Sequence, residues 1–233
     1  MPKTNPSAGE KAIVVEGGVS ALSRRKFLSY ASVLSGLLVG ASACDKDDNP
    51  STSTVNLGSG DLGILNYAYA LEQLEAAFYT KVISSQYSGI TSAETALLTD
   101  IRDHEIAHRE FFKTALSSNA IPALEVDFSS INFGSKDSVL ATAKAFEDLG
   151  VSAYNGAGKL ITSPDYLVLA GKIVSVEARH AAYIRDLISN GSFADGTVVD
   201  ANGLDKSRTP AEVLAIASTY LKTKINANNL PTS

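Results

Sequence analysis

Apolar side chains recur every three or four positions along most of the chain from Asp61 onward, which is the spacing of one face of an α-helix. This pattern predicts four long helices, and the breaks between them fall at Gly, Pro, Ser and Thr residues. The four helices are predicted at about residues 61–85, 92–117, 138–161 and 164–190. A shorter helix is predicted at about 210–224, and no segment shows the alternation typical of a strand.

The connections predict how these helices pair. Short links join the first helix to the second and the third to the fourth, so each pair should be antiparallel. A polar, Pro-containing stretch at about 118–137 must then cross from one pair to the other. The sequence therefore predicts an all-α fold, with a four-helix bundle over 61–190, a long crossover between helices two and three, and a C-terminal loop and short fifth helix over 191–233 that pack on the bundle.

The first 44 residues differ from this pattern. A basic pair, Arg24 and Arg25, precedes a short apolar run and the small residues Ala41 to Ala43, which are the parts of a secretory signal peptide. The apolar run is too short and too rich in Ser and Gly for a convincing transmembrane helix. The segment Ser23-Arg24-Arg25-Lys26-Phe27-Leu28 resembles the twin-arginine export motif at every defined position, which implies transport of an already folded protein by that export machinery.

The only cysteine of the chain lies where such a signal would be cut. Ala41-Ser42-Ala43-Cys44 resembles a bacterial lipobox, although Leu is usual at the position of Ala41. The resemblance implies that Cys44 becomes a lipidated N-terminus anchored to a membrane, so that the protein faces the periplasm or the cell surface. Simple cleavage after Ala43, which leaves a free thiol, is the alternative. Residues 45–60 are polar and predict a flexible tether; their Asp-Lys-Asp-Asp cluster resembles a surface-export signal as much as a solvated linker.

Composition narrows the chemistry. The 233 residues include one Cys and three His, and the net charge of −5 argues against nucleic-acid binding. A single Cys excludes an internal disulfide, a thiolate zinc site and an iron–sulfur cluster. Any metal must therefore be held by carboxylates and imidazoles.

Two of the three histidines occur in the same local motif, Glu-x-x-His. Glu105 precedes His108 in the second helix and Glu177 precedes His180 in the fourth. Residues three apart lie on one face of a helix, so each carboxylate and imidazole can reach a common point. Both motifs fall on apolar stripes, where an ionised Glu is costly without a compensating cation. His104 points about a hundred degrees away around the helix and is expected at the surface or behind a ligand.

The other two long helices add inward carboxylates. The third helix offers Glu147, and the first offers Glu72 and Glu75 as alternatives. Tyr79 follows Glu72 by seven residues and Tyr154 follows Glu147 by seven, which is two helical turns in each case. This match favours Glu72 over Glu75 and indicates a duplicated helical pair around a pseudo-twofold axis. Either tyrosine can hydrogen-bond a ligand carboxylate, supply an electron, or simply pack in the core.

This arrangement resembles the ferritin-like di-metal carboxylate proteins, in which two helices give one Glu each and two give Glu-x-x-His. The resemblance assigns the metal ligands to Glu72, Glu105, His108, Glu147, Glu177 and His180. The segments ALEQLEAAFY and TPAEVLAIASTYL further resemble a bacterial and fungal subgroup of exported ferritin-like proteins, some of them called desiccation-related.

The resemblance implies two divalent metal ions, with iron favoured over manganese, and a small oxidant as partner. Oxidation of ferrous iron by oxygen or peroxide, or peroxide scavenging, would be the activity. A stress-associated structural or binding lipoprotein with a structural or vestigial metal site is the alternative, so the sequence leaves enzymatic turnover open. It leaves the oligomeric state open as well.

Overall fold

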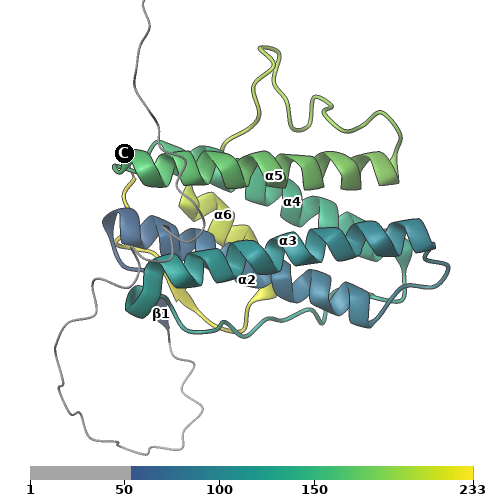
Figure 1. The fold of residues 1–233 in the computed structure, drawn as a ribbon, viewed down its shortest axis with the longest axis horizontal. Coiled ribbons are helices and arrows are strands. Elements are labelled where there is room, and N and C mark those ends of the chain that lie inside the picture. The colour runs from purple at the N-terminus through teal and green to yellow at the C-terminus, as the bar shows by residue number, and fades with distance from the viewer. Residues whose placement is uncertain (1–53, 233) are drawn as a thin grey trace, which may run out of the picture. The chain divides into compact units, whose positions relative to one another are not determined.

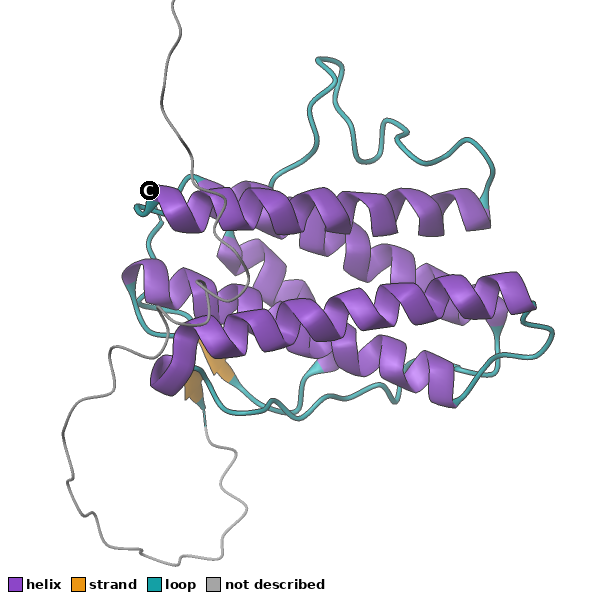
Figure 2. Ribbon diagram, viewed as in Figure 1, coloured by secondary structure: helices purple, strands orange, loops and turns teal. Residues whose placement is uncertain are grey.

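The computed structural model describes residues 54–232, and this part of the chain is mainly helical (Figures 1 and 2). Its helices are α2 (Gly60–Ser84), α3 (Ser92–Leu116), α4 (Lys136–Gly158), α5 (Pro164–Ile188) and α6 (Pro210–Ala217). Short 3-10 turns follow α3 (Ser117–Asn119) and α6 (Ser218–Tyr220). The predicted all-α class is confirmed, and among the described helices none is long and apolar enough to cross a membrane.

Local signals explain where several helices begin. Thr91 accepts a hydrogen bond from the Glu94 amide while the Glu94 carboxylate accepts from the Thr91 amide, a capping box that starts α3. Ser163 caps α5 immediately before Pro164. Asp61, by contrast, does not cap α2, because its carboxylate accepts bonds from Thr162 and Ser163 at the start of α5.

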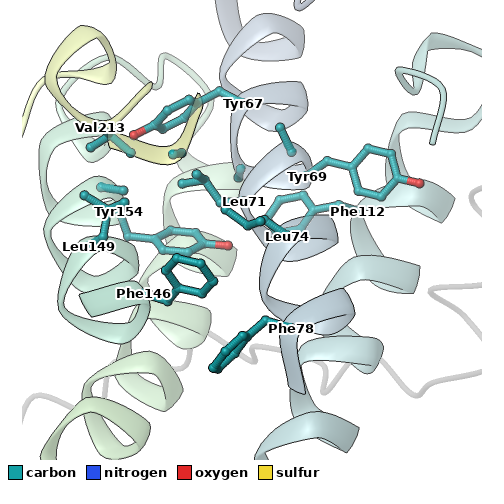
Figure 3. Packing of buried hydrophobic residues seen from close by; sticks show 14 of the residues in the cluster. Tyr67, Tyr69, Leu71, Leu74, Phe78, Phe112, Phe146, Leu149, Tyr154 and Val213 are labelled. Atoms are coloured by element: carbon teal, nitrogen blue, oxygen red, sulfur yellow. The ribbon is translucent and has the colours of Figure 1, made fainter. Parts of the chain in front are cut away.

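The helices form two antiparallel pairs, α2 with α3 and α4 with α5, and the pairs meet mainly through α2 and α4 (Figure 1). These two helices are the most deeply buried. Figure 3 shows their apolar side chains packed between them, with Phe78 from α2 and Phe146 from α4 meeting edge to face at 5.1 Å between ring centroids. The interface between α2 and α4 therefore holds the core of the bundle.

Two buried polar side chains of α2 hold the crossover between α3 and α4. Asn66 donates to the carbonyl of Asn119 and accepts from the amide of Ile121. Gln73 accepts from the amide of Leu124. These bonds satisfy the backbone of a segment that has no regular ladder of its own, so the long crossover lies fixed against α2.

Two corrections apply at the ends of the described region. Val55–Asn56 (β1) pair in parallel with Ile225–Asn226 (β2), and Leu57 is fully buried, so the fold begins within the stretch predicted as a tether. Two-residue strands are too short to show alternation, which is why the sequence did not indicate them. The last helix ends at Ala217 rather than near residue 224, because the chain from Tyr220 to Thr223 bonds to the crossover at Glu125 and Asp127.

The loop between α5 and α6 is tied to the bundle by one guanidinium. Arg185 is 2% exposed and forms a bidentate pair with Asp148 of α4, with both N–O distances at 2.8 Å. It also donates to Thr197 and lies 3.2 Å from an Asp195 oxygen. Further along, the backbone at Arg208 passes so close to α4 that only a glycine fits at position 156.

Candidate metal centre

Six side chains from the middle turns of the four long helices converge inside the bundle. Each of α3 and α5 supplies a Glu and a His, and each of α2 and α4 supplies one Glu. The residues are Glu72, Glu105, His108, Glu147, Glu177 and His180. All four glutamates are fully buried, His180 is 5% exposed, and His108 is half-buried. The structure thus brings together all six residues named from the sequence.

The six residues form two overlapping groups. Glu72, Glu105, His108 and Glu177 make one group, and Glu105, Glu147, Glu177 and His180 make the other. Within each group the potential ligand atoms lie within 4.8 Å of one another. Two ligand atoms at about 2.1 Å from one ion lie at most about 4.2 Å from each other, so each group is close to the size of one cation position. Glu105 and Glu177 belong to both groups and stand where bridging carboxylates would.

The polar atoms of this cluster are not paired with each other in the ordinary way. Eight of them are buried without a hydrogen-bond partner among the described residues: Glu72 Oε2, both oxygens of Glu105, His108 Nδ1, Glu147 Oε2, both oxygens of Glu177, and His180 Nδ1. Buried polar atoms nearly always find partners, and leaving them without any costs free energy. A donor set of this kind fits divalent cations.

The distances between these atoms support the same conclusion. His108 Nδ1 lies 2.9 Å from Glu177 Oε1. His180 Nδ1 lies 2.8 Å from Glu105 Oε1. These nitrogens are near enough to the oxygens for ion pairs, yet their ring N–H directions do not give hydrogen bonds. The atoms are therefore close together without being hydrogen-bonded to one another.

Each tyrosine of the two Glu-x6-Tyr matches bonds to the glutamate of the other half. Tyr79 donates its hydroxyl hydrogen to Glu147 Oε1 at 2.5 Å, and Tyr154 donates to Glu72 Oε1. One oxygen of each carboxylate is therefore occupied, and the other is left facing the cluster. Of the roles considered from the sequence, both tyrosines thus have that of a hydrogen-bond donor to a carboxylate of the cluster. The two bonds are related by the pseudo-twofold symmetry of α2 and α4.

Glu75 breaks that relation. It is 4% exposed and belongs to neither group, whereas Glu72 belongs to one. The residue in the matching place on α4 is Gly150, and a Cβ there would lie 3.2 Å from Glu75 Oε1 and 3.5 Å from Glu177 Oε2. The missing side chain of Gly150 therefore makes room for a fifth carboxylate beside the six residues. The sequence suggested Glu72 and Glu75 as alternatives, but both are buried at the site.

Burial and mutual repulsion shape the electrostatics. Desolvation raises the pKa of Glu72 to about 7, and it raises the pKa of Glu177 and Glu75 well above the usual range, with help from neighbouring carboxylates. Burial alone would also raise the pKa of Glu105, but the two imidazoles lower it to about 2.

The histidines respond in the opposite sense. Burial would lower their pKa values, but the surrounding carboxylates raise the pKa of His108 to about 12 and that of His180 to about 10. Without cations, protons balance the charge of the cluster.

Three residues near the motifs lie outside the groups. His104 is exposed, and its Nδ1 lies 3.0 Å from His180 Nε2, so it lies at the surface and behind a histidine of the cluster, as expected. Arg109 pairs with Glu110 on the same helix, and Arg179 is exposed and bonds to Ser175. The predicted lipidation site, Cys44, and the predicted signal peptide lie outside the described residues.

A four-helix bundle with a buried cluster of carboxylates and imidazoles at its centre defines the ferritin-like class of proteins. A family model described as ferritin-like domain matches residues 60–190, which are the four long helices. The chain belongs to this family. No curated protein matches the chain.

Proposed function

We propose that the protein binds two divalent cations in this cluster and reacts with a small oxidant, oxygen or peroxide, as an iron oxidase or a peroxide scavenger. Iron is the first candidate and manganese the second, because carboxylate and imidazole ligands suit both. The observation that supports the proposal is the set of eight buried, unpartnered atoms in two groups that share Glu105 and Glu177.

Charge favours two ions over one. Four ionised ligand carboxylates carry four negative charges, which two divalent cations neutralise when both histidines are neutral. A fifth carboxylate, Glu75, holds its proton more readily because burial raises its pKa. The loaded site would then be close to neutral, which a buried site requires.

The chain itself has three tasks in this chemistry. When bound, a pair of iron or manganese ions would supply one-electron redox chemistry toward a small oxidant. Glu105 and Glu177 would be shared by the two cation positions. Tyr79 and Tyr154 hold the carboxylates of Glu147 and Glu72 in place by hydrogen bonds. Apolar side chains line a small pocket next to Glu75 and make that flank of the site apolar: Leu71, Leu74, Phe146 and Leu149.

Metal analysis and a reaction with oxidant test the proposal. The protein is purified without oxygen, its metal content is measured, and ferrous iron is added, followed by oxygen or peroxide. We expect two ions per chain and a ligand-to-metal absorption band. Glu147→Ala should abolish the band, whereas Glu110→Ala, at an exposed position of α3, should leave it unchanged.

The outcomes separate the two candidate functions. Two bound ions without turnover would favour the structural or stress-associated lipoprotein. Failure to bind any metal with all six residues intact would refute the site itself.

We also propose that the protein is exported by the twin-arginine pathway and anchored in the cell envelope through Cys44. The support is the sequence of residues 23–44. The mass of the mature N-terminus distinguishes a lipidated Cys44 from simple cleavage after Ala43. Replacing Arg24 and Arg25 by Lys should retain the protein inside the cell, and Cys44→Ser should release it from membranes; membrane attachment of Cys44→Ser would contradict the anchor.

A further inference from the structure

We propose that His104 is a positioning residue for the metal centre, and that it makes the cation position at His180 bind more tightly than the position at His108. The inference rests on the proposed function, since it concerns how the same site holds its cations. His104 Nδ1 lies 3.0 Å from His180 Nε2, and the planes of the two rings are nearly parallel, 9° apart, with centroids separated by 5.2 Å.

The two ring nitrogens of His180 have different surroundings. Nδ1 is buried and lies 2.8 Å from Glu105 Oε1 and 3.5 Å from Glu147 Oε2. Nε2, on the other side of the ring, meets His104. The fold therefore selects Nδ1 as the ligand atom and gives Nε2 to the hydrogen bond.

This contact determines where the proton lies when a cation is bound. A cation at Nδ1 needs the lone pair of that nitrogen, so the proton of the neutral His180 ring remains on Nε2. Nε2–H then donates to His104 Nδ1, and the proton of His104 must be on its own Nε2. His104 is exposed, so this second N–H can be hydrated. A partner of this kind fixes the tautomer and the ring orientation of a ligand.

His108 has no such partner among the described residues. Glu105 and His108 of α3 match Glu177 and His180 of α5, so the residue that corresponds to His104, four before the histidine, is Val176. A valine neither donates nor accepts a hydrogen bond. The two cation positions thus share Glu105 and Glu177, but within the described part of the chain only the histidine of one position has a hydrogen-bond partner at its other ring nitrogen. Loss of such a partner typically costs 10- to 100-fold in metal affinity.

Calorimetric titration with Mn²⁺ in the absence of oxygen tests the inference on the whole protein. The wild type should bind two ions in two steps of different affinity. His104→Val, which copies Val176, should weaken the tighter step by about 10- to 100-fold and leave the other nearly unchanged. His104→Asn should recover most of the affinity, because its side-chain oxygen can accept the same bond. Ala107→Val is the matched control, since it puts a valine on the same exposed face of α3.

A second measurement reads the tautomer directly. With only three histidines in the chain, ¹⁵N spectra of the Zn²⁺-loaded protein can be assigned by single substitutions. His180 should carry a slowly exchanging Nε2–H in the wild type and in His104→Asn, but not in His104→Val.

The outcomes distinguish the two proposals. A wild type that binds no Mn²⁺ refutes the proposed function and this inference with it. A wild type that binds two ions, with His104→Val binding both as tightly and keeping the His180 signal, overturns the role of His104 alone.

Discussion

Glu72→Gln should have opposite effects on stability with and without metal. Glu72 is fully buried among other carboxylates and shares a group with Glu105, His108 and Glu177. In the metal-free protein the buried charge of Glu72 lowers stability, whereas under the proposed function it would be a metal ligand in the loaded protein. Gln keeps the oxygen that accepts from Tyr154 and nearly the same volume, so the substitution changes mainly the charge.

The magnitude follows from the pKa of Glu72. Burial raises this pKa from 4.5 to about 7, so the folded protein holds the proton more tightly than the unfolded chain. The contribution of Glu72 to the free energy of unfolding is therefore fully present below pH 4.5 and is lost as the pH rises through 7. One pKa unit is worth 1.36 kcal/mol, so at pH 8 the ionised Glu72 costs the metal-free protein about 3 kcal/mol. Glu72→Gln should recover most of that at pH 8 and almost nothing at pH 4.

Urea unfolding with a chelator at pH 4 and pH 8 measures the first effect. The same experiment with Mn²⁺ at about 100 times its dissociation constant measures the second. Each bound ion should stabilise the wild type by about 2.7 kcal/mol, and Glu72→Gln should lose most of the gain from one ion. Glu110→Gln, half exposed on α3, should change stability by less than about 0.5 kcal/mol throughout. If Glu72→Gln is less stable than the wild type at pH 8 with chelator, burial does not control this carboxylate and the reasoning is refuted.

Three further predictions concern protons, the C-terminal loop and helix packing. Binding of two ions must displace the protons of the two cluster histidines, whose pKa values are raised to about 12 and 10. The logarithm of the overall association constant for both ions should therefore rise by about two or more per pH unit near neutrality. Calorimetry in buffers of different ionisation enthalpy counts these protons, and a pH-independent constant would contradict the pairing of the histidines with the carboxylates. Arg185→Ala should lower the free energy of unfolding by about 3 kcal/mol and make the loop over 191–209 susceptible to limited proteolysis. An unchanged cleavage pattern would show that other contacts hold the loop. Gly156→Ala should lower the melting temperature, because its methyl group would lie 1.7 Å from the carbonyl oxygen of Arg208. Gly171→Ala is the control: this position has open space around it, so the substitution should stabilise α5 by up to about 1 kcal/mol.

The sequence predicted the helices and the six clustered residues because both depend on local spacing. A Glu three residues before a His lies on its face of the helix in any bundle, and the apolar stripe indicates which face is buried. The pairing of helices followed from connection lengths. Local spacing and connection length do not depend on which side chains lie across the bundle.

Features that depend on distant contacts could not be predicted. Asp61 lies in the first turn of α2, yet its carboxylate accepts a hydrogen bond from Thr162, about a hundred residues away in sequence. Glu75 and Glu72 are both accommodated at the site because Gly150 lies opposite, which is visible only once α2 and α4 are packed. The one sequence signal for this arrangement was that Gly150 stands in the second half at the position that Glu75 occupies in the first.

The division of ligands between the two helix pairs links metal binding to folding. Neither helix pair contains a complete group of potential ligands. The group with His108 includes Glu177 from α5, and the group with His180 includes Glu105 from α3. These two helices contribute little direct packing to each other, because the pairs meet mainly through α2 and α4. A cation bound at either proposed position would therefore be a reversible cross-link between the two helix pairs. Chelation should therefore loosen the α3–α5 side of the bundle before the α2–α4 core separates, and hydrogen exchange on α3 and α5 should be the first to respond.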